Sequence, residues 1–342
     1  MRLRVFALAF VAPLAGCLAN SIIDSTSGNG STVLPALESA PYDSLGTAKL
    51  SWQRFATTAG SFRGIYLLNG ATRTTQSLLA TRALDRAMQH PTTGALVYGA
   101  QTATGNSIFD LYTTRLSDSV ETRLSSGTET EQYPSWSPNG SLIYYSYRLN
   151  GKTTVARQAP TAGAIRDTLV LVDSQTVSWI IDSPIAVNAA GRMALVVNSS
   201  GWRIWAVDFA GTNRVKLRED IRSGIGPIFQ GVQWSPDGTK IAFLELNYDV
   251  ADQLTSTTVK TMNPDGTGEV SYVTVNTLPF SFNATSLNDF SLCWLDATRI
   301  AFTALGNDRA SHVYIVHFAG ASKLTQVTSN SGVFDRGVSC RQ

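Results

Sequence analysis

The sequence predicts an all-β protein, most of whose 342 residues form a six-bladed β-propeller of four-stranded blades. Three observations predict this fold. A Trp-Ser-Pro-(Asp/Asn)-Gly motif occurs twice, strand-like segments repeat at a period of about 50 residues, and the last residues supply a strand that the first repeat lacks. The composition agrees, because charged residues make up 15% of the chain, below the roughly 25% that is usual for soluble domains.

The first 16 residues predict a secretory signal peptide. Arginines precede an apolar stretch at positions 5–15 that is too short to span a bilayer as a mature helix. Leu-Ala-Gly-Cys at 14–17 resembles a bacterial lipobox, in which the cysteine is acylated. We therefore expect a lipid on Cys17. Because Leu18 rather than Asp follows, we expect an outer-membrane anchor facing the periplasm. The alternative is an ordinary signal peptide that contains a cysteine by chance.

The predicted domain organisation has three parts. Residues 1–16 are the lipoprotein signal peptide, and residues 17–44 are mostly small and polar without a sustained period. Such a composition favours a flexible tether between the lipid and the folded domain. Residues 45–342 form the propeller.

Each repeat of the propeller region has a marker position at the end of its first strand. Successive markers are 47, 51, 47, 60 and 46 residues apart. A tight turn follows, in which Pro presets φ, Asp or Asn bonds the local backbone and Gly accepts a positive φ. A second strand comes next, as in residues 240–243 and 299–302. The markers are Gln89, Trp136, Val187, Trp234, Trp294 and Cys340.

A third strand and its turn also recur, at 202–217, 259–273 and 313–327. Together with the marker motifs, these segments resemble the TolB-type, WD-repeat-like propeller repeat over residues 45–342. The resemblance implies a propeller that binds a protein, because TolB binds the peptidoglycan-associated lipoprotein through its propeller. TolB also has an α/β domain ahead of the propeller and no lipobox, so the resemblance does not imply the same partner.

The two ends of the propeller region complete one another. The first unit, residues 46–79, has no marker strand, and the terminal GVSCRQ is a marker strand with nothing after it. Pairing them closes the ring with the C-terminal strand and removes exposed sheet edges. Cys293 and Cys340 would then lie on neighbouring inner strands. They could form a disulfide, which an exported protein permits, or remain two buried thiols.

No recognisable catalytic motif occurs in the sequence. Gly-x-Ser-x-Gly, a Walker loop and His-Glu-x-x-His are all missing, so we expect no enzyme and no cofactor. The three histidines, His90, His312 and His317, are expected to be structural or exposed. A net charge of +2 without a basic cluster gives no reason to expect nucleic acid as a partner. Nothing in the sequence indicates an oligomeric state.

The candidate binding site is a polar rim where the inner strands begin. Carboxylates stand four or five positions before most markers, and longer loops at 247–257 and 275–289 belong to the same face. The rim could meet a partner or hold a cation such as calcium; the alternative is that each acid caps its local turn. The acids are Asp85, Glu131, Asp182, Asp289 and Asp335, and the flanking residues are Arg86, Gln132, Tyr133, Gln230 and Arg336.

The sequence therefore favours a lipid-anchored, non-catalytic envelope scaffold that binds a protein or peptide at this rim. The alternative is an envelope propeller that binds or cleaves saccharide. A deep pocket with two carboxylates at the separation found in glycosidases would favour that alternative.

Overall fold

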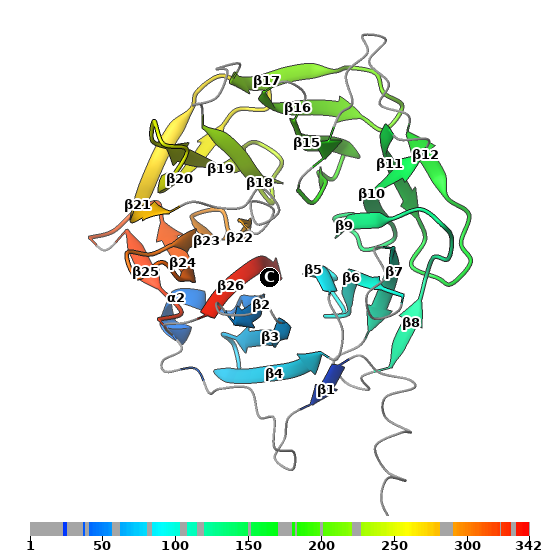
Figure 1. The fold of residues 1–342 in the computed structure, drawn as a ribbon, viewed down its shortest axis with the longest axis horizontal. Coiled ribbons are helices and arrows are strands. Elements are labelled where there is room, and N and C mark those ends of the chain that lie inside the picture. The colour runs from blue at the N-terminus through cyan, green and yellow to red at the C-terminus, as the bar shows by residue number, and fades with distance from the viewer. Residues whose placement is uncertain are drawn as a thin grey trace, which may run out of the picture.

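The computed structural model describes residues 23–25, 37, 41–56, 62–80, 84–102, 108–114, 120–149, 152–169, 180–181, 183–198, 201–220, 227–280, 290–321, 323–329 and 333–341. Over these residues the protein is an all-β propeller, in which antiparallel sheets stand around a central axis (Figure 1). Within this described part of the chain, no helix is long and apolar enough to cross a membrane.

Four sheets stand separately around the ring, and each begins with its strand nearest the axis (Figure 1). The first contains β5 (Leu84–Gln89), β6 (Leu96–Gln101), β7 (Phe109–Thr114) and β8 (Glu121–Arg123). The second contains β9 (Glu131–Trp136), β10 (Ile143–Leu149), β11 (Lys152–Gln158) and β12 (Asp167–Leu169). The third contains β13 (Ile180–Ile181), β14 (Ala186–Val187), β15 (Arg192–Asn198), β16 (Trp202–Asp208) and β17 (Val215–Asp220). The fourth contains β18 (Ile228–Trp234), β19 (Ile241–Tyr248), β20 (Leu254–Met262) and β21 (Val270–Phe280).

The remaining strands form one nine-stranded sheet in the order β1-β4-β3-β2-β26-β24-β23-β22, with β25 on β24. Its members from the start of the chain are β1 (Ile23–Ser25), β2 (Lys49–Ala56), β3 (Phe62–Asn69) and β4 (Thr74–Ala80). Those from the end are β22 (Leu292–Asp296), β23 (Arg299–Leu305), β24 (Ser311–His317), β25 (Leu324–Gln326) and β26 (Val333–Arg341).

The prediction of six four-stranded blades is therefore wrong. Four blade sheets are separate, and the strands expected to form the first and last blades are hydrogen-bonded into one sheet. The reason lies in β26, which pairs antiparallel with β2 along its length and also begins beside β24. There Ser311 and Phe334 form a parallel bridge, and the Ser311 hydroxyl donates to the Asp335 carbonyl oxygen at 2.7 Å.

The strand count within the sheets also differs from the prediction. The inner strand of the third sheet is divided into β13 and β14, which pair separately with β15. Pro184 lies between these two short strands, and a proline has no N–H to donate to a ladder.

Part of the segment for which the sequence predicts a flexible tether is ordered against the propeller. Strand β1 pairs with Leu78–Ala80 of β4, where it covers an otherwise open sheet edge. Further along, the short helix α2 (Tyr42–Leu45) brings Leu45 into the core, where it is fully buried.

Neighbouring sheets pack face to face through large apolar side chains. Trp234 of β18 lies in one cluster with Val196 and Ile204 of the third sheet. Trp294 of β22 lies in another cluster with Leu244 of the fourth sheet. The marker tryptophans thus fill the wedge between one sheet and the preceding one, which explains why the motif recurs.

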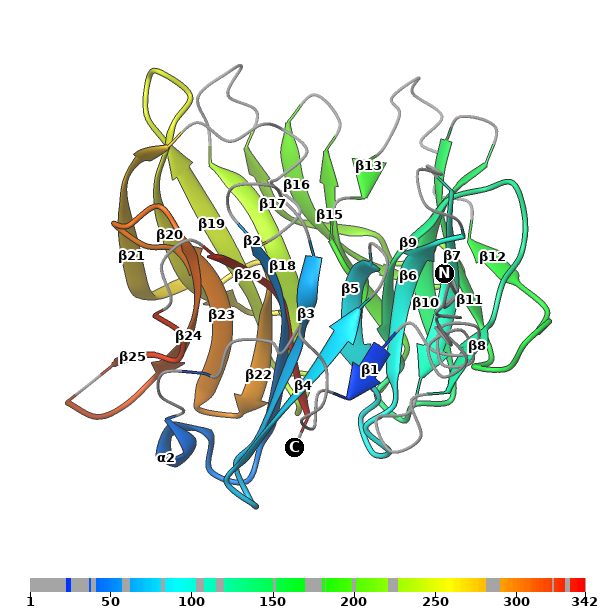
Figure 2. The same cartoon turned by 60° about the horizontal axis from the view of Figure 1, so that its bottom comes forward.

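Two faces of the ring are distinguished below. The inner strands begin at the entry face and end at the turn face, where the Pro-Asn-Gly and Pro-Asp-Gly turns follow β9 and β18. Figure 2 shows the sheets from the side, with α2 and the C-terminal end of β26 toward the same face of the ring.

Candidate functional site

A bulge interrupts the inner strands three residues before their markers. The register of β9, β18 and β26 against the neighbouring strand shifts there. Tyr133, Gly231 and Gly337 occupy this position, with φ values of 56°, 63° and 63°. A Cβ at position 231 would also lie 3.0 Å from backbone atoms of Ser291 and Leu292. Glycine suits such a position, whereas a bulky residue such as Tyr133 adopts it only under strain.

Arg86 crosses the central channel at the level of these bulges. It comes from β5 and is 4% exposed. Its guanidinium lies 5.8 Å from the ring centroid of Tyr133 on β9 and donates to the carbonyl oxygen of Phe290 at 3.3 Å. A Cβ on Gly337 would lie 3.6 Å from Arg86 Cγ. One side chain therefore contacts inner segments from several sides of the ring, and it fills the channel there.

Buried amide groups add to this polar layer. Gln230 is fully buried on β18, and Gln53 on β2 is 2% exposed. Within the described part of the chain, neither polar atom of the Gln230 amide has a hydrogen-bond partner, and the same is true of Gln53 Nε2. An unpaired buried amide costs roughly 1–3 kcal/mol. This layer is therefore a place where polar groups have been retained at a cost in stability.

The carboxylates predicted to form a rim are, where the structure describes them, enclosed in ion pairs. Asp335 is fully buried and accepts two hydrogen bonds from Arg54, at 2.6 and 2.8 Å. Glu131 is 1% exposed and accepts hydrogen bonds from Arg166, at 2.9 Å, and from Ser125. Both acids turn into the protein, away from the channel mouth.

The other predicted site residues are distributed as follows. Asp182, Asp289 and the lipidation candidate Cys17 lie outside the described residues, as does the side chain of Asp85. Gln132 is partly exposed at the start of β9. Arg336 lies over the rings of Phe55 and Phe334, at 4.8 and 5.1 Å. The structure brings Arg86 and Tyr133 together but does not assemble a ring of free carboxylates from the residues it describes.

The turn face opens into a cavity of about 420 Å³ at the other end of the channel, which we call the funnel. The ends of the inner strands and the turns after them line it, so that every inner strand contributes. Its lining mixes indole rings and proline rings with small polar groups. Among the residues that shape it are Trp136, Trp234, Trp294, Gln89, Gln233 and Arg341.

Two of the three indole N–H groups of the funnel donate to a backbone carbonyl oxygen of the preceding inner strand, and the third does not. Trp136 Nε1 donates to the Met88 carbonyl oxygen at 3.0 Å, and Trp294 Nε1 donates to that of Gln233 at 3.4 Å. Each acceptor belongs to the residue just before the marker of the preceding inner strand. Trp234 would reach Ala186 on the short strand β14, but its N–H has no partner among the described residues. The indole N–H beside β14 is thus buried without a partner in the described part of the chain.

One wall of the funnel is covalently joined. Cys293 and Cys340 form a disulfide with an S–S distance of 2.10 Å, and both residues line the cavity. Arg341 is the one charged residue among the described lining residues. Burial, together with the charge of Arg341, lowers the pKa of His90, which packs against Trp136. Among the described lining residues, Arg341 is therefore the one side chain that is charged at neutral pH.

The remaining histidines, His312 and His317, have local polar contacts. His312 is 2% exposed and its Nε2 lies 2.9 Å from Asp308. Within the described ranges, no group of three or more His, Cys, Asp or Glu side chains is placed to hold a metal ion.

Comparisons with solved structures show the same fold. TolB from Acinetobacter baumannii superposes with a TM-score of 0.62 at 13% identity, over 86% of this chain and 67% of that one. A putative TolB from Agrobacterium tumefaciens gives 0.53 at 14% identity, over 86% of this chain and 98% of that one. The fold is that of a TolB-like propeller. At these identities the similarity concerns the fold alone.

Structures that superpose less well carry no further argument about this chain. Prolyl oligopeptidase B from Galerina marginata superposes with a TM-score of 0.47 at 8% identity, over 83% of this chain and 41% of that one. No protein family and no curated protein matches the sequence.

Sequence reasoning missed the funnel, because it placed the candidate binding site where the inner strands begin. The signal was present in the markers themselves: residues that end successive inner strands must converge where those strands end. The sequence could not show that Arg86 blocks the channel, since its long side chain reaches a carbonyl 204 positions away.

Proposed function

We propose that this protein is a non-catalytic binding propeller of the bacterial cell envelope, which captures a protein or peptide segment in the funnel. The observation that carries the proposal is the funnel itself, a cavity of about 420 Å³ to which every inner strand contributes. Its aromatic and proline surfaces can pack against side chains, while accessible polar groups of the lining such as Gln233 and Thr92 can bond a peptide backbone.

The funnel suits a chain end or a single inserted loop better than a long segment. Arg86 and Tyr133, both almost fully buried, fill the channel beyond it, so an inserted segment has to stop at their level. Arg341 at the mouth favours a partner with negative charge nearby.

The location remains part of the proposal. The signal peptide and the lipobox ending at Cys17 support a lipid-anchored lipoprotein at the outer membrane.

Capture from native envelopes tests the proposal. Chemical crosslinking and pull-down would compare the wild-type chain with Thr92→Trp, which adds a bulky ring at the funnel lining. The matched control is Thr93→Trp, because Thr93 is the exposed neighbour outside the lining. We expect Thr92→Trp to lose the captured partner and Thr93→Trp to retain it.

Two results would overturn the proposal. Equal capture by both variants would remove the funnel as the binding site. If no form captures a protein and all forms bind a glycan array, the saccharide alternative replaces the peptide one.

A further inference from the structure

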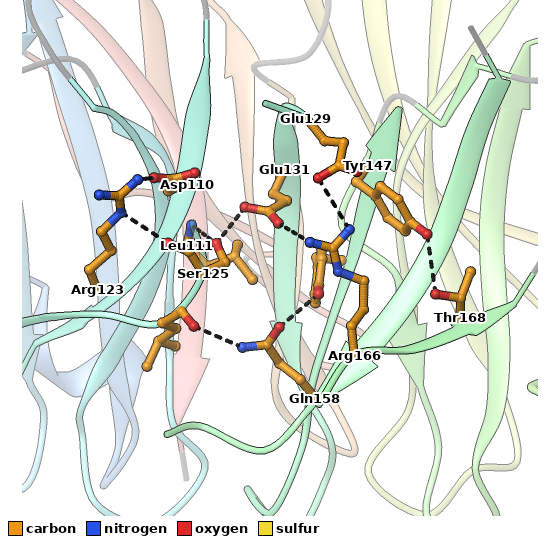
Figure 3. Close-up of polar contacts among 12 residues, drawn as sticks. Asp110, Leu111, Arg123, Ser125, Glu129, Glu131, Tyr147, Gln158, Arg166 and Thr168 are labelled. Atoms are coloured by element: carbon orange, nitrogen blue, oxygen red, sulfur yellow. Dashed lines mark hydrogen bonds and ion pairs between the residues drawn. The ribbon is translucent and has the colours of Figure 1, made fainter. Parts of the chain in front are cut away.

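A second cavity, of about 350 Å³, lies between the sheet of β5–β8 and the sheet of β9–β12. It is separate from the funnel, and the two cavities share no lining residue. Arg123 and Arg166 border it from the two sides, with Ser125 and Gln158 between them (Figure 3). Ser126 also lines the cavity. The small residues on either side of Gly163 leave space along one wall of the cavity. We call this cavity the interblade pocket.

Buried carboxylates stand behind both arginines and hold them in place (Figure 3). Arg123 forms an ion pair with Asp110, which is fully buried on β7. Arg166 donates to Glu131 at 2.9 Å, and its other terminal nitrogen lies 3.6 Å from Glu129. Neither Asp110 nor Glu131 lines the pocket. The two-carboxylate arrangement that would favour saccharide cleavage is therefore not presented to this cavity.

The guanidinium groups still have donors available for a ligand. Arg123 uses Nε on the Ser125 carbonyl oxygen at 3.0 Å and one terminal nitrogen on Asp110. Arg166 lies 4.4 Å from the ring centroid of Tyr147 and, besides its contacts with the glutamates, has hydrogen-bond interactions with the side chains of Tyr145 and Tyr147. A guanidinium has five N–H donors, and the contacts within the described part of the chain leave more of them unused on Arg123 than on Arg166. The two side chains are 46% and 25% exposed.

The hydrogen bonds around the pocket fix its other polar groups. Ser125 donates to Glu131 and accepts from the Leu111 backbone N–H. Gln158 accepts from Tyr145 at 2.7 Å and donates to the Leu124 carbonyl oxygen at 3.4 Å. With these groups already engaged, the lining offers mainly N–H donors from opposite sides. Planar guanidinium groups match the two oxygens of a carboxylate.

We propose that the interblade pocket binds a small molecule through its carboxylate group, held between Arg123 and Arg166. The volume of about 350 Å³ lies at the lower end of the range for small-molecule sites. It suits a ligand the size of a sugar acid or a dipeptide. The site is independent of the funnel and of the partner proposed there.

Glu131 makes this binding depend on pH. Burial raises the pKa of its carboxyl group to about 7, against the opposing effects of the Ser125 hydrogen bond and the Arg166 charge. When Glu131 takes up a proton, Arg166 loses a negative partner and its charge becomes available to a ligand. The groups that face Glu131 from the surrounding elements are Asp110 with its partner Arg123, Glu129, Tyr145, Tyr147 and Arg166.

Isothermal titration calorimetry on the purified full chain tests the proposal. The probes are glucuronate and N-acetylglycylglycine, each compared with a neutral counterpart, glucose and N-acetylglycylglycine amide, at pH 6 and pH 8. We expect a carboxylate probe to bind and its neutral counterpart not to bind. Binding should be several-fold to about tenfold tighter at pH 6, because with a pKa of about 7 the protonated fraction of Glu131 rises about tenfold between pH 8 and pH 6. Which carboxylate binds more tightly tells a sugar acid from a peptide end.

Substitutions test whether the carboxylate binds in the interblade pocket rather than elsewhere on the protein. Arg123→Gln should weaken binding about tenfold or more, whereas Arg157→Gln, which changes an arginine paired with Asp167 outside the pocket, should not. Glu131→Gln should bind equally at both pH values.

A second pair of variants tests the pocket without replacing Arg123, so that the test does not depend on the folding of the Arg123 variant. Ala162→Trp fills the pocket without touching an ion pair, and Ile165→Trp is its control on the same loop, 92% exposed and outside the lining. Binding lost only in Ala162→Trp supports the proposal. Binding retained in Ala162→Trp, equal binding of the neutral counterparts, or no binding of either carboxylate by the folded chain overturns it.

Discussion

At the entry end of the channel the inner strands carry Arg86 and Tyr133, and at the turn end the same strands carry Met88 and Trp136. The first pair lies almost fully buried across the axis. The second pair lines an open cavity. Strands of one repeat thus build a filled layer at one end and a funnel at the other.

The difference comes from where the bulge stands. Before it, acids such as Asp335 and Glu131 turn into the sheets and are neutralised by arginines. After it, the strands converge on their markers, where indole rings fill the wedge but leave space at the axis. The acids at the entry end are therefore paired with arginines inside the sheets, while the turn end keeps an open cavity.

The largest expected effect concerns the entry end. Asp335→Ala should destabilise the protein by about 3–5 kcal/mol, because it leaves the buried Arg54 guanidinium without its carboxylate. Denaturant unfolding measures the change. Asp43→Ala is the matched control, since its pair with Arg73 is exposed and should contribute less than about 1 kcal/mol. Similar losses in both variants would mean that the buried pair has no special role.

The next effect distinguishes Glu131 from Asp335, its counterpart in the repeat. Burial raises the pKa of Glu131 from its ordinary 4.5 to about 7. The folded protein therefore keeps a proton that the unfolded chain releases in this window, and stability falls as pH rises from 4.5 to 7. The loss is on the order of 3 kcal/mol.

Glu131→Gln removes this titration while keeping the shape of the side chain. Its stability relative to wild type should therefore rise between pH 4.5 and pH 8, as measured by denaturant unfolding at each pH. Glu129→Gln is the control, because it changes a more exposed partner of the same arginine and should have an effect below about 1 kcal/mol at either pH. A pH-independent difference for Glu131→Gln would contradict the account.

The smallest effect concerns the bulge. Tyr133 has a φ of 56° where the equivalent residues of β18 and β26 are the glycines Gly231 and Gly337. Replacing it by Gly and by Ala removes the same ring, but only Gly adopts this backbone without cost. Tyr133→Gly should therefore be more stable than Tyr133→Ala by about 1 kcal/mol. If the alanine variant is the more stable in thermal unfolding, the backbone at this position is not strained.

Much of the fold could be predicted from the sequence, because motifs that recur at a regular spacing indicate repeated structural units. The tryptophan markers, the tight turns and the pairing of the C-terminal strand with β2 all follow from local pattern. The sequence pattern does not indicate that the first and last repeats join into one sheet, because that joining depends on one bridge between Ser311 and Phe334. The funnel and the interblade pocket could not be predicted from the sequence either. Ion pairs such as Glu131–Arg166 join positions 35 residues apart, and no spacing rule indicates which side chains will meet.

The contrast between the two channel ends can be tested most directly by site-specific photo-crosslinking in native envelopes. One protein would carry the photo-reactive residue at Thr92, in the funnel lining, and another at Gln132, at the start of β9 on the entry face. The account predicts a crosslinked partner from position 92 and none from position 132. A partner captured from position 132 and not from position 92 would contradict it, and would place recognition at the entry face.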